Sequence, residues 1–361
     1  MFRIDARLII RVAPFGMDLV LSGYYLAASL LLIELKANPV ELGLVGSITA
    51  AVHMILAHRM GHLSDRFGRR RLILLSPALL ISSCLFATVT NEVRVILLLC
   101  ALNGFCLSLF WPALQAWVAD LQTDSGLARD IGTFNMAWTA SNLIGPIISG
   151  FLFGFHPRLP FFFAATLSSI LFLLSYGSIH DRPGTVKGKE AVIESPSQTW
   201  HKNFLYSAWI ANFMSWFILG NARYQFPKLA RELGSSPRAV GLFIGCLGFS
   251  LFLGFFLLRR NDLWHFRKRY VFGAQALAAV GLLIIYFFSS AFLFALAMTL
   301  IGLSASLTYY SSLLYAIRLS AQKGRGTGFH ESILSIGALV GPLLGGLGAH
   351  FFGLRIPYLI C

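Results

Sequence analysis

Long runs of apolar residues separated by short polar segments recur along the whole chain. A helix of about 20 apolar residues is long enough to cross the ~30 Å hydrocarbon core of a bilayer. The runs are too long, and alternate too little, to be membrane strands. The pattern therefore predicts eleven membrane-spanning helices, at residues 12–35, 41–60, 72–90, 93–118, 132–154, 159–180, 204–226, 237–258, 270–289, 291–317 and 329–352.

One polar segment, from Asp181 to Asn203, breaks the pattern of short connections. Its glycines, prolines and lysines are typical of a flexible linker. It separates six predicted spans from five. We therefore expect a six-helix bundle at residues 1–180, a cytoplasmic linker at 181–203 and a second bundle at 204–361.

Composition and charge agree with a membrane protein. Hydrophobic residues make up 57% of the 361 residues and charged residues only 12%, against about 25% charged residues in soluble domains. If the N-terminus is cytoplasmic, 21 of the 29 basic residues fall in cytoplasmic segments, as the positive-inside rule requires. The net charge of +14 is thus a topology signal spread over many loops, and no nucleic-acid partner is expected.

An internal repeat emerges when the chain is shifted by 196 residues against itself. A Gly-Pro pair and a glycine four residues after the proline then coincide in the fifth and eleventh spans, where small residues allow close helix packing and proline favours a kink. The matching residues are Gly145, Pro146, Gly150, Gly341, Pro342 and Gly346.

The same shift places the counterpart of the sixth span near Leu354. The segment from Leu354 to Cys361 resembles the start of the sixth span at Arg158. A span needs about 20 residues, so we expect a twelfth helix that is cut short, giving eleven complete transmembrane helices.

The loop after the second span carries the most specific motif, Gly-His-Leu-Ser-Asp-Arg-Phe-Gly-Arg-Arg-Arg at residues 61–71. It resembles the G-x-L-x-D-R-x-G-R-[RK] signature of the major facilitator superfamily, and the chain is similar to its bacterial members, with no subfamily indicated. The matching gating residues are Gly61, Asp65, Arg66, Gly68, Arg69 and Arg70.

This resemblance implies a fold and a mode of action. The fold is all-α, with two six-helix bundles related by pseudo-two-fold symmetry, and the bundles rock about a central site. The motif loop would help to close the cytoplasmic side, and Glu331, at the start of the eleventh span, is either a partner of Arg69 or Arg70 in this gate or a solvated interfacial carboxylate.

The resemblance also implies a pathway between the halves, so polar residues inside the spans are candidates for substrate or proton contacts. Asp18, Ser22 and Tyr25 share one helical face in the first span, and Asp18 either carries the coupled proton or lies at the interface. The full candidate set is Asp18, Ser22, Tyr25, His53, Asn103, Trp111, Gln115, Trp138, Asn142, Asn212, Trp216, Tyr309 and Tyr310.

Some absences narrow the function. No Arg or Lys is expected near the middle of a pathway helix, which disfavours fixed anions such as organic phosphates. Proton-linked drug exporters of the superfamily usually place an Arg in the fourth span, where this chain has Cys100. This difference disfavours drug–proton antiport and leaves the coupling ion open. No P-loop, GxSxG element or Cys/His metal set is recognised, and the five cysteines show no pairing pattern, so we expect no enzyme, no cofactor and no metal.

The expected function is secondary active transport of a small organic solute, uncharged or amphipathic, with proton coupling as the candidate driving force. The protein would be a monomer in the plasma membrane, multi-pass, in contact with the lipid bilayer and with its N-terminus in the cytoplasm. The alternative is a protein that transports nothing, either a solute sensor or an inactive truncated form.

Overall fold

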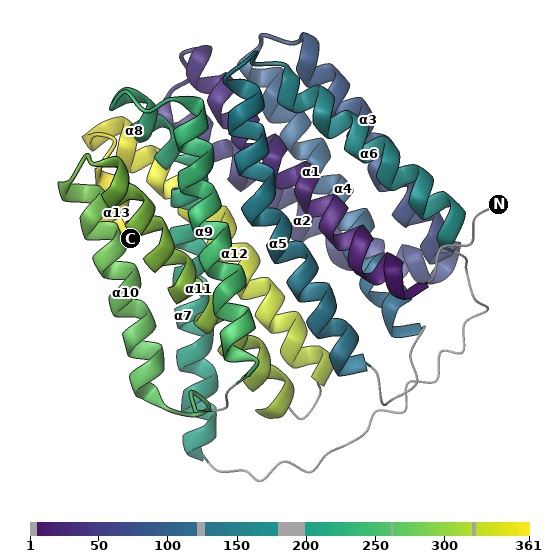
Figure 1. Cartoon of the computed structure of the whole chain (residues 1–361). Helices are drawn as coiled ribbons and strands as arrows, with labels where there is room; N and C mark the ends of the chain where they lie inside the picture. The colour runs from purple at the N-terminus through teal and green to yellow at the C-terminus, as the bar shows by residue number, and fades with distance from the viewer. Residues whose placement is uncertain (1–5, 121–126, 180–198, 261–262, 320–322) are drawn as a thin grey trace.

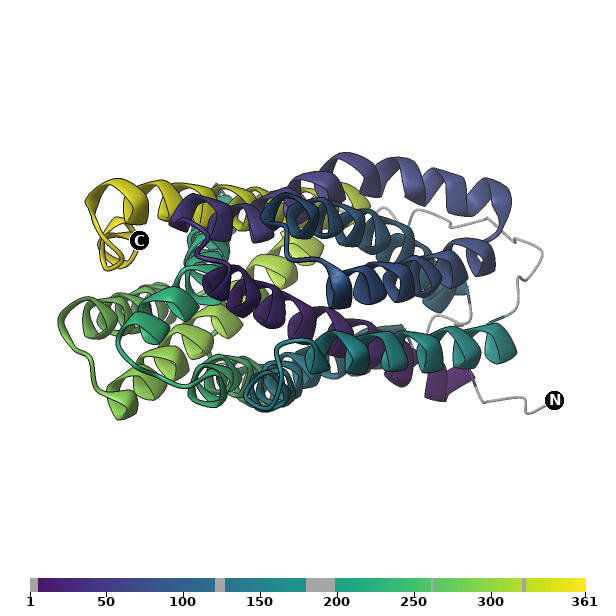
Figure 2. The same cartoon turned by 90° about the horizontal axis from the view of Figure 1, so that it is seen from above.

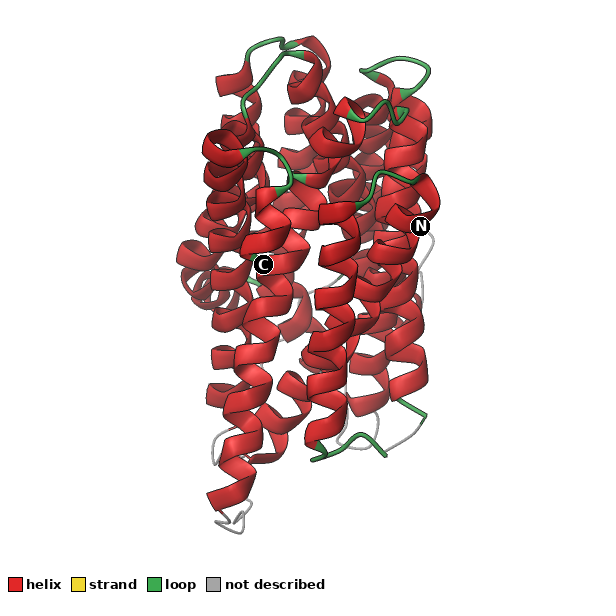
Figure 3. Ribbon diagram, turned by 90° about the vertical axis from the view of Figure 1, so that its left-hand side faces the viewer, coloured by secondary structure: helices red, strands yellow, loops and turns green. Residues whose placement is uncertain are grey.

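The chain was examined as a computed structural model, which describes residues 6–120, 127–179, 199–260, 263–319 and 323–361. Within these ranges all regular structure is helical (Figure 3). Ten of the described helices are long and apolar enough to cross a membrane. The helices are α1 Ala6–Glu34, α2 Pro39–Phe67, α3 Arg69–Val89, α4 Val93–Asp120, α5 Leu127–Phe153, α6 Leu159–Ser178, α7 Thr199–Tyr224, α8 Phe226–Glu232, α9 Pro237–Leu258, α10 Lys268–Phe287, α11 Ala291–Leu319, α12 Lys323–Phe352 and α13 Ile356–Ile360.

The long helices form two groups that lie side by side, α1 to α6 in one and α7 to α13 in the other (Figures 1 and 2). Exposed apolar side chains such as Phe86, Phe287 and Phe352, which are 61%, 67% and 75% exposed, cover the outside. In a bilayer this surface faces lipid chains, and the helices satisfy their own backbone hydrogen bonds. The predicted fold class, an all-α membrane protein built from two helical bundles, is confirmed.

The predicted spans match these helices, with two differences. The seventh expected span is α7, which is not among the ten apolar spans because it carries buried Asn212, Ser215 and Asn221. The following segment contains the short helix α8, which the sequence did not predict. The predicted linker lies almost entirely outside the described residues, so the division of the chain at 181–203 stays a prediction.

Local sequence explains where several helices begin. Asn38 forms a capping box with Glu41, in which each side chain accepts a hydrogen bond from the other residue's backbone N–H. Pro39 follows at the first helical position, where its missing N–H costs nothing.

The helix bundle has two ends. The motif side is the end that holds the 61–71 loop. The far side is the opposite end, which holds residues 35–38, 90–92, 154–158, 225–236, 288–290 and 353–355.

The repeat is visible in the packing of its small residues. A Cβ atom on Gly145 would lie 3.0 Å from the carbonyl oxygen of Leu19 on α1. A Cβ on Gly341 would lie 2.7 Å from Cα of Phe217 on α7, which is the counterpart of α1. Each Gly-Pro element thus packs against the first helix of its own half, which only a glycine permits at this separation.

The later glycine of each element packs across the two halves. A Cβ on Gly150 of α5 would lie 2.6 Å from the Pro237 carbonyl oxygen and 2.8 Å from Cα of Gly241, both on α9. A Cβ on Gly346 of α12 would lie 2.7 Å from the carbonyl oxygen of Pro39 on α2. Glycine-mediated contacts therefore hold the two halves together on the far side.

The sixth helix of each half begins with an arginine that caps a neighbouring helix. Arg158 and Arg355 share the same backbone angles (φ −90°, ψ −19°) and each precedes a helix with a proline in its first two positions. Arg158 Nη1 donates to the Ala87 carbonyl at 3.0 Å at the end of α3. Arg355 Nη1 donates to the Ile285 carbonyl at 3.0 Å at the end of α10. Each guanidinium satisfies carbonyls that a helix C-terminus leaves unpaired.

We predict that Arg158→Ala destabilises the N-terminal half without changing the site. The change removes a charged donor to the C-terminal carbonyls of α3, and such a hydrogen bond contributes about 1.5–3 kcal/mol. Thermal unfolding of the purified protein in detergent is expected at a lower temperature, while ligand affinity stays the same. Arg94→Ala, an exposed arginine on the far side, is the control, and an equal loss of stability in both variants would contradict the capping role.

Candidate functional site

A cavity of about 520 Å³ lies between the two halves. Binding sites for small organic molecules are commonly about 300–1,000 Å³ in volume. Side chains from α1, α2, α4 and α5 line it on one side and from α7, α9, α11 and α12 on the other. On the motif side it reaches His58, Gln115 and Gly328, and on the far side it ends at Gly46 and Tyr224.

Tight packing closes the far end of the cavity. A Cβ on Gly46 would lie 2.6 Å from Cδ2 of the Tyr224 ring, so α2 and the end of α7 are in direct contact there. The buried Gln225 side chain donates to the Pro39 carbonyl at 3.0 Å and to the Pro342 carbonyl at 3.3 Å, which joins α2 to α12. The molecule is therefore closed on the far side, and the cavity extends toward the motif side.

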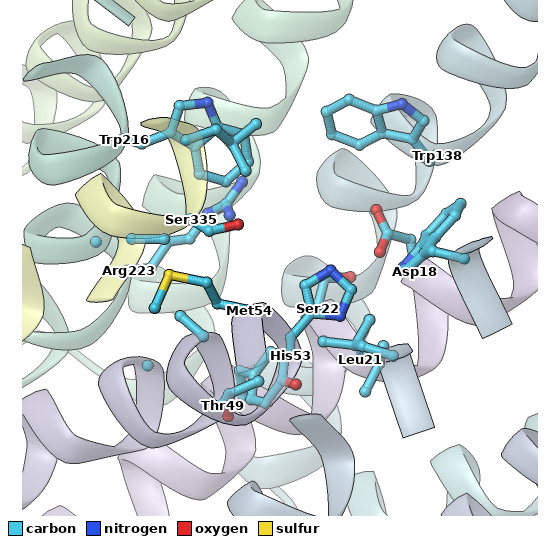
Figure 4. A pocket seen from close by; sticks show the side chains of 18 of the residues that line it. Asp18, Leu21, Ser22, Thr49, His53, Met54, Trp138, Trp216, Arg223 and Ser335 are labelled. Atoms are coloured by element: carbon cyan, nitrogen blue, oxygen red, sulfur yellow. The ribbon is translucent and has the colours of Figure 1, made fainter. Parts of the chain in front are cut away.

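Three polar side chains connect the halves inside the cavity. Asn142 of α5 donates through Nδ2 to Oδ2 of Asp18 on α1 at 2.9 Å. Its Oδ1 accepts from Nη2 of Arg223 on α7 at 3.1 Å. One amide thus bridges a carboxylate of the first half and a guanidinium of the second, and hydrogen bonds to charged partners are stronger than neutral ones. Figure 4 shows Asp18 and Arg223 on opposite sides of the pocket.

Aromatic rings form a second feature of the cavity wall. Trp138 of α5 and Trp216 of α7 lie on opposite sides of the pocket (Figure 4), and Tyr309 of α11 contacts both rings, with centroid separations of 6.0 Å and 6.5 Å. The Arg223 guanidinium lies 5.8 Å from the centroid of the Trp216 ring. Such rings offer flat apolar surface and a negative face for cations.

Most of the predicted pathway residues meet at this cavity. It is lined by Asp18, Ser22, Tyr25, His53, Trp111, Gln115, Trp138, Asn142, Trp216 and Tyr309. Asn103 and Asn212 lie elsewhere, fully buried between helices. Tyr310 packs against Trp264 with a centroid separation of 5.4 Å. For these three residues the structure does not support a place in the cavity, because their positions on α4, α7 and α11 turn them into helix contacts.

One basic side chain reaches the cavity from the end of a pathway helix, although no Arg or Lys was expected near the middle of one. Arg223 stands at the C-terminal end of α7, yet its side chain lines the cavity. The long arginine stem lets the guanidinium lie far from its own backbone. One sequence signal points to Arg223 as a cavity residue. Gly220 follows Trp216 by four residues and Arg223 follows Gly220 by three, so all three share one helical face.

The motif loop has a definite local structure. Gly68 ends α2 and starts α3 with φ 93°, a conformation that favours glycine. Asp65 forms an ion pair with Arg69 at 3.3 Å, and Arg70 donates to the Tyr176 carbonyl on α6 at 2.9 Å. Gly61 has room for a side chain, since an added Cβ would be 3.8 Å from its nearest neighbour. Closure of the motif side by this loop stays a prediction.

Glu331 is exposed and lines the cavity on α12. Next to it, the buried His330 ring is in hydrogen-bonding contact with the Ser312 hydroxyl at 2.7 Å through Nδ1. Glu331 is thus an acidic group of the cavity mouth, and its pairing with Arg69 or Arg70 in the gate remains a prediction for a state closed on the motif side.

A helical membrane protein with two related halves around a central cavity has the architecture of a transporter. The model of the Major Facilitator Superfamily matches this chain over residues 12–259 and again over 208–361. The chain belongs to the major facilitator superfamily.

Comparison with individual proteins agrees with this family assignment. The chain is 29% identical over 142 residues to Multidrug resistance protein 1 of Bacillus subtilis (strain 168), and the match covers 39% of this chain and 36% of the relative. It is 27% identical over 141 residues to Quinolone resistance protein NorA of Staphylococcus aureus (strain Mu50 / ATCC 700699), with coverage of 39% and 36%. The matched region thus spans little more than a third of these relatives' length.

Solved transporters show the same fold over nearly the whole chain. The nucleoside transporter NupG superposes with a TM-score of 0.77 at 13% identity, covering 99% of this chain and 96% of NupG. A bacterial homolog to the human lysosomal transporter Spinster, in an inward-facing and occupied conformation, gives 0.75 at 15% identity, covering 96% of this chain and 82% of the homolog. At 13% and 15% identity, the likeness to these two solved structures concerns the fold.

Proposed function

We propose that this protein is a secondary active transporter that moves an amphipathic organic solute with an aromatic portion by alternating access. The carrying observation is the cavity between the halves, closed on the far side and reaching the motif side. Because basic residues concentrate on the motif side, that side is assigned to the cytoplasm of the plasma membrane. The present conformation then exposes the site to the cytoplasm.

The chemistry of the cavity supports this substrate class. Trp138, Trp216 and Tyr309 provide flat apolar surface for a ring system, and Asp18 and Arg223 provide one charge of each sign. A solute with an aromatic portion and a polar or charged end fits both features. Because the Arg223 guanidinium can bind an acidic group, a solute with a fixed negative charge is no longer disfavoured. Two of the relatives are named for drug resistance, one of them for resistance to quinolones.

Asp18 is the proposed site of proton coupling. It lies half-buried inside α1, and an ionisable group within a membrane span is costly unless it serves a function. Its link through Asn142 to Arg223 couples its charge to the contact between the halves. Protonation of Asp18 would remove the anion that holds this network and favour one orientation of the halves over the other.

Whole-cell accumulation tests the proposal. Bacterial cells that express the full chain are expected to change their content of fluorescent amphipathic aromatic dyes relative to cells with an empty vector, and a protonophore is expected to abolish the difference. A panel with cationic, neutral and anionic dyes of similar ring size ranks the charge preference. Identical accumulation in both strains for every dye would favour the alternative, a protein that transports nothing.

The aromatic rings are predicted to contribute directly to affinity. Trp138→Ala is expected to weaken binding of an aromatic solute by about 2–10-fold, since an aromatic pair contributes about 0.5–1.5 kcal/mol. Trp138→Phe should retain most of the affinity. Binding measured by fluorescence anisotropy on purified protein checks this, with Trp209→Ala as control because Trp209 packs on Phe329 away from the cavity lining. Equal weakening in the control would contradict a ligand contact.

A further inference from the structure

Two histidines on the motif-side half of α2 stand one helical turn apart. His58 and His62 are both exposed, and their Nε2 atoms lie 3.2 Å from each other. The two rings are nearly perpendicular, with centroids 4.6 Å apart and an interplanar angle of 85°. Residues four apart share a helix face, so the helix itself holds both imidazoles in place. The proposed transport function uses neither ring.

The separation of the two nitrogens fits a shared metal ion. Zn²⁺ binds imidazole nitrogen at about 2.0–2.1 Å with tetrahedral angles, which places two ligand nitrogens about 3.3–3.4 Å apart. The observed 3.2 Å is close to this value, so an ion can bind both nitrogens with hardly any movement. Which Nε2 donates to the other depends on the tautomer. An ion that binds both Nε2 atoms would replace this hydrogen bond, with each ring carrying its proton on Nδ1.

We propose that His58 and His62 form a binding site for a divalent transition-metal ion such as Cu²⁺, Ni²⁺ or Zn²⁺. Neutral imidazole is a ligand for these ions, whereas Mg²⁺ and Ca²⁺ prefer oxygen ligands. Both rings are accessible from the solvent of the motif side. Water completes the coordination, and this leaves the site weaker than a complete three- or four-ligand protein site.

Two histidines four residues apart are not a complete metal-ligand set, so the sequence alone does not single out this pair. Among the described residues there is no cluster of three or more His, Cys, Asp or Glu side chains with metal-site geometry. Asp65 follows His62 by three residues on the same stripe of α2, and its Oδ1 is engaged by Arg69. The site therefore rests on two imidazoles, a His-x3-His spacing that a helix turns into a chelate.

The site lies where an ion would affect the cavity. His58 is one of the residues that line the cavity on the motif side. An ion bound there adds two positive charges at the mouth and fixes the His58 ring toward His62. Metal binding itself is the property under test, so its outcome does not depend on whether the protein transports a solute.

Isothermal titration calorimetry of the full chain, purified in detergent with any polyhistidine tag removed, tests the proposal. We expect one Cu²⁺ per chain, weaker binding of Ni²⁺ and Zn²⁺, and no binding of Mg²⁺. His58→Ala and His62→Ala should each reduce Cu²⁺ affinity at least tenfold. The control His350→Ala, which removes an exposed histidine at the end of α12, should leave it unchanged.

Electron paramagnetic resonance of the Cu²⁺-loaded wild-type protein gives a second readout that needs no variant. Coupling to two imidazole nitrogens from one ion is expected, reduced to one in each single substitution. Absence of Cu²⁺ binding, a signal from one nitrogen in the wild type, or unchanged affinity in both His58→Ala and His62→Ala would overturn the proposal.

Discussion

Asp18→Asn is expected to abolish accumulation of the solute against its gradient while exchange of solute across the membrane continues. With one proton per solute, a pH difference of one unit supplies about 1.4 kcal/mol and supports roughly tenfold accumulation. Asn keeps the size of the side chain and can accept the hydrogen bond from Asn142, so the network to Arg223 is largely retained. The negative charge and the exchangeable proton are lost together, so the protein can no longer respond to a proton gradient at this position.

Flux measurements in proteoliposomes with and without a pH gradient separate the two activities. Glu92→Gln removes an exposed carboxylate from the far side and should behave as the wild type. Glu331→Gln tests the other acidic group of the cavity. If Asp18→Asn still concentrates the solute and Glu331→Gln does not, the coupling site is Glu331, and the role given to Asp18 is wrong.

Gly241→Ala is expected to shift the protein toward the state that is open on the far side. A Cβ at this position would lie 2.6 Å from the Pro146 carbonyl oxygen and 3.0 Å from Cα of Gly150. Both neighbours are backbone on α5, so α5 and α9 have to separate. Overpacking of this kind costs about 1–3 kcal/mol, which corresponds to an increase of about 5–150-fold in the ratio of far-side-open to far-side-closed molecules.

Double electron–electron resonance between spin labels at positions 92 and 290 measures this shift. Both positions are exposed on the far side, one in each half, so a longer distance reports opening there. Gly273→Ala is the matched control, because a Cβ on Gly273 of α10 meets nothing within 4 Å and the gain in helix propensity is the same. Unchanged distance distributions in Gly241→Ala would show that this contact does not hold the far side closed.

Features that depend on spacing along one helix were predictable from the sequence. Hydropathy gave the spans, and the 196-residue shift pointed to Gly145 and Gly341, whose packing against α1 and α7 is equivalent in the structure. A repeat of this kind implies two halves and therefore a site between them. The same reasoning predicts that Asp18, Trp138 and Asn142 belong to that site.

Features that depend on where long side chains lie were not predictable. Arg223 looked like a loop charge because its backbone is at the end of α7, yet its guanidinium lies beside Asn142. Asn103 and Asn212 looked like pathway residues but are buried between helices, because hydropathy gives the length of a helix and not the direction of each face. The His58 and His62 pair needed the helix geometry to show that two nitrogens meet.

The most direct test of the account is solute counterflow in proteoliposomes that contain only the purified 361-residue chain. Vesicles loaded with an unlabelled aromatic solute that binds the cavity are placed in a trace of the labelled solute. The account predicts transient uptake of label above the level of protein-free vesicles, reduced in Gly241→Ala and weakened by Trp138→Ala at low solute concentration. Binding of the solute without any counterflow in the wild type would contradict transport by alternating access.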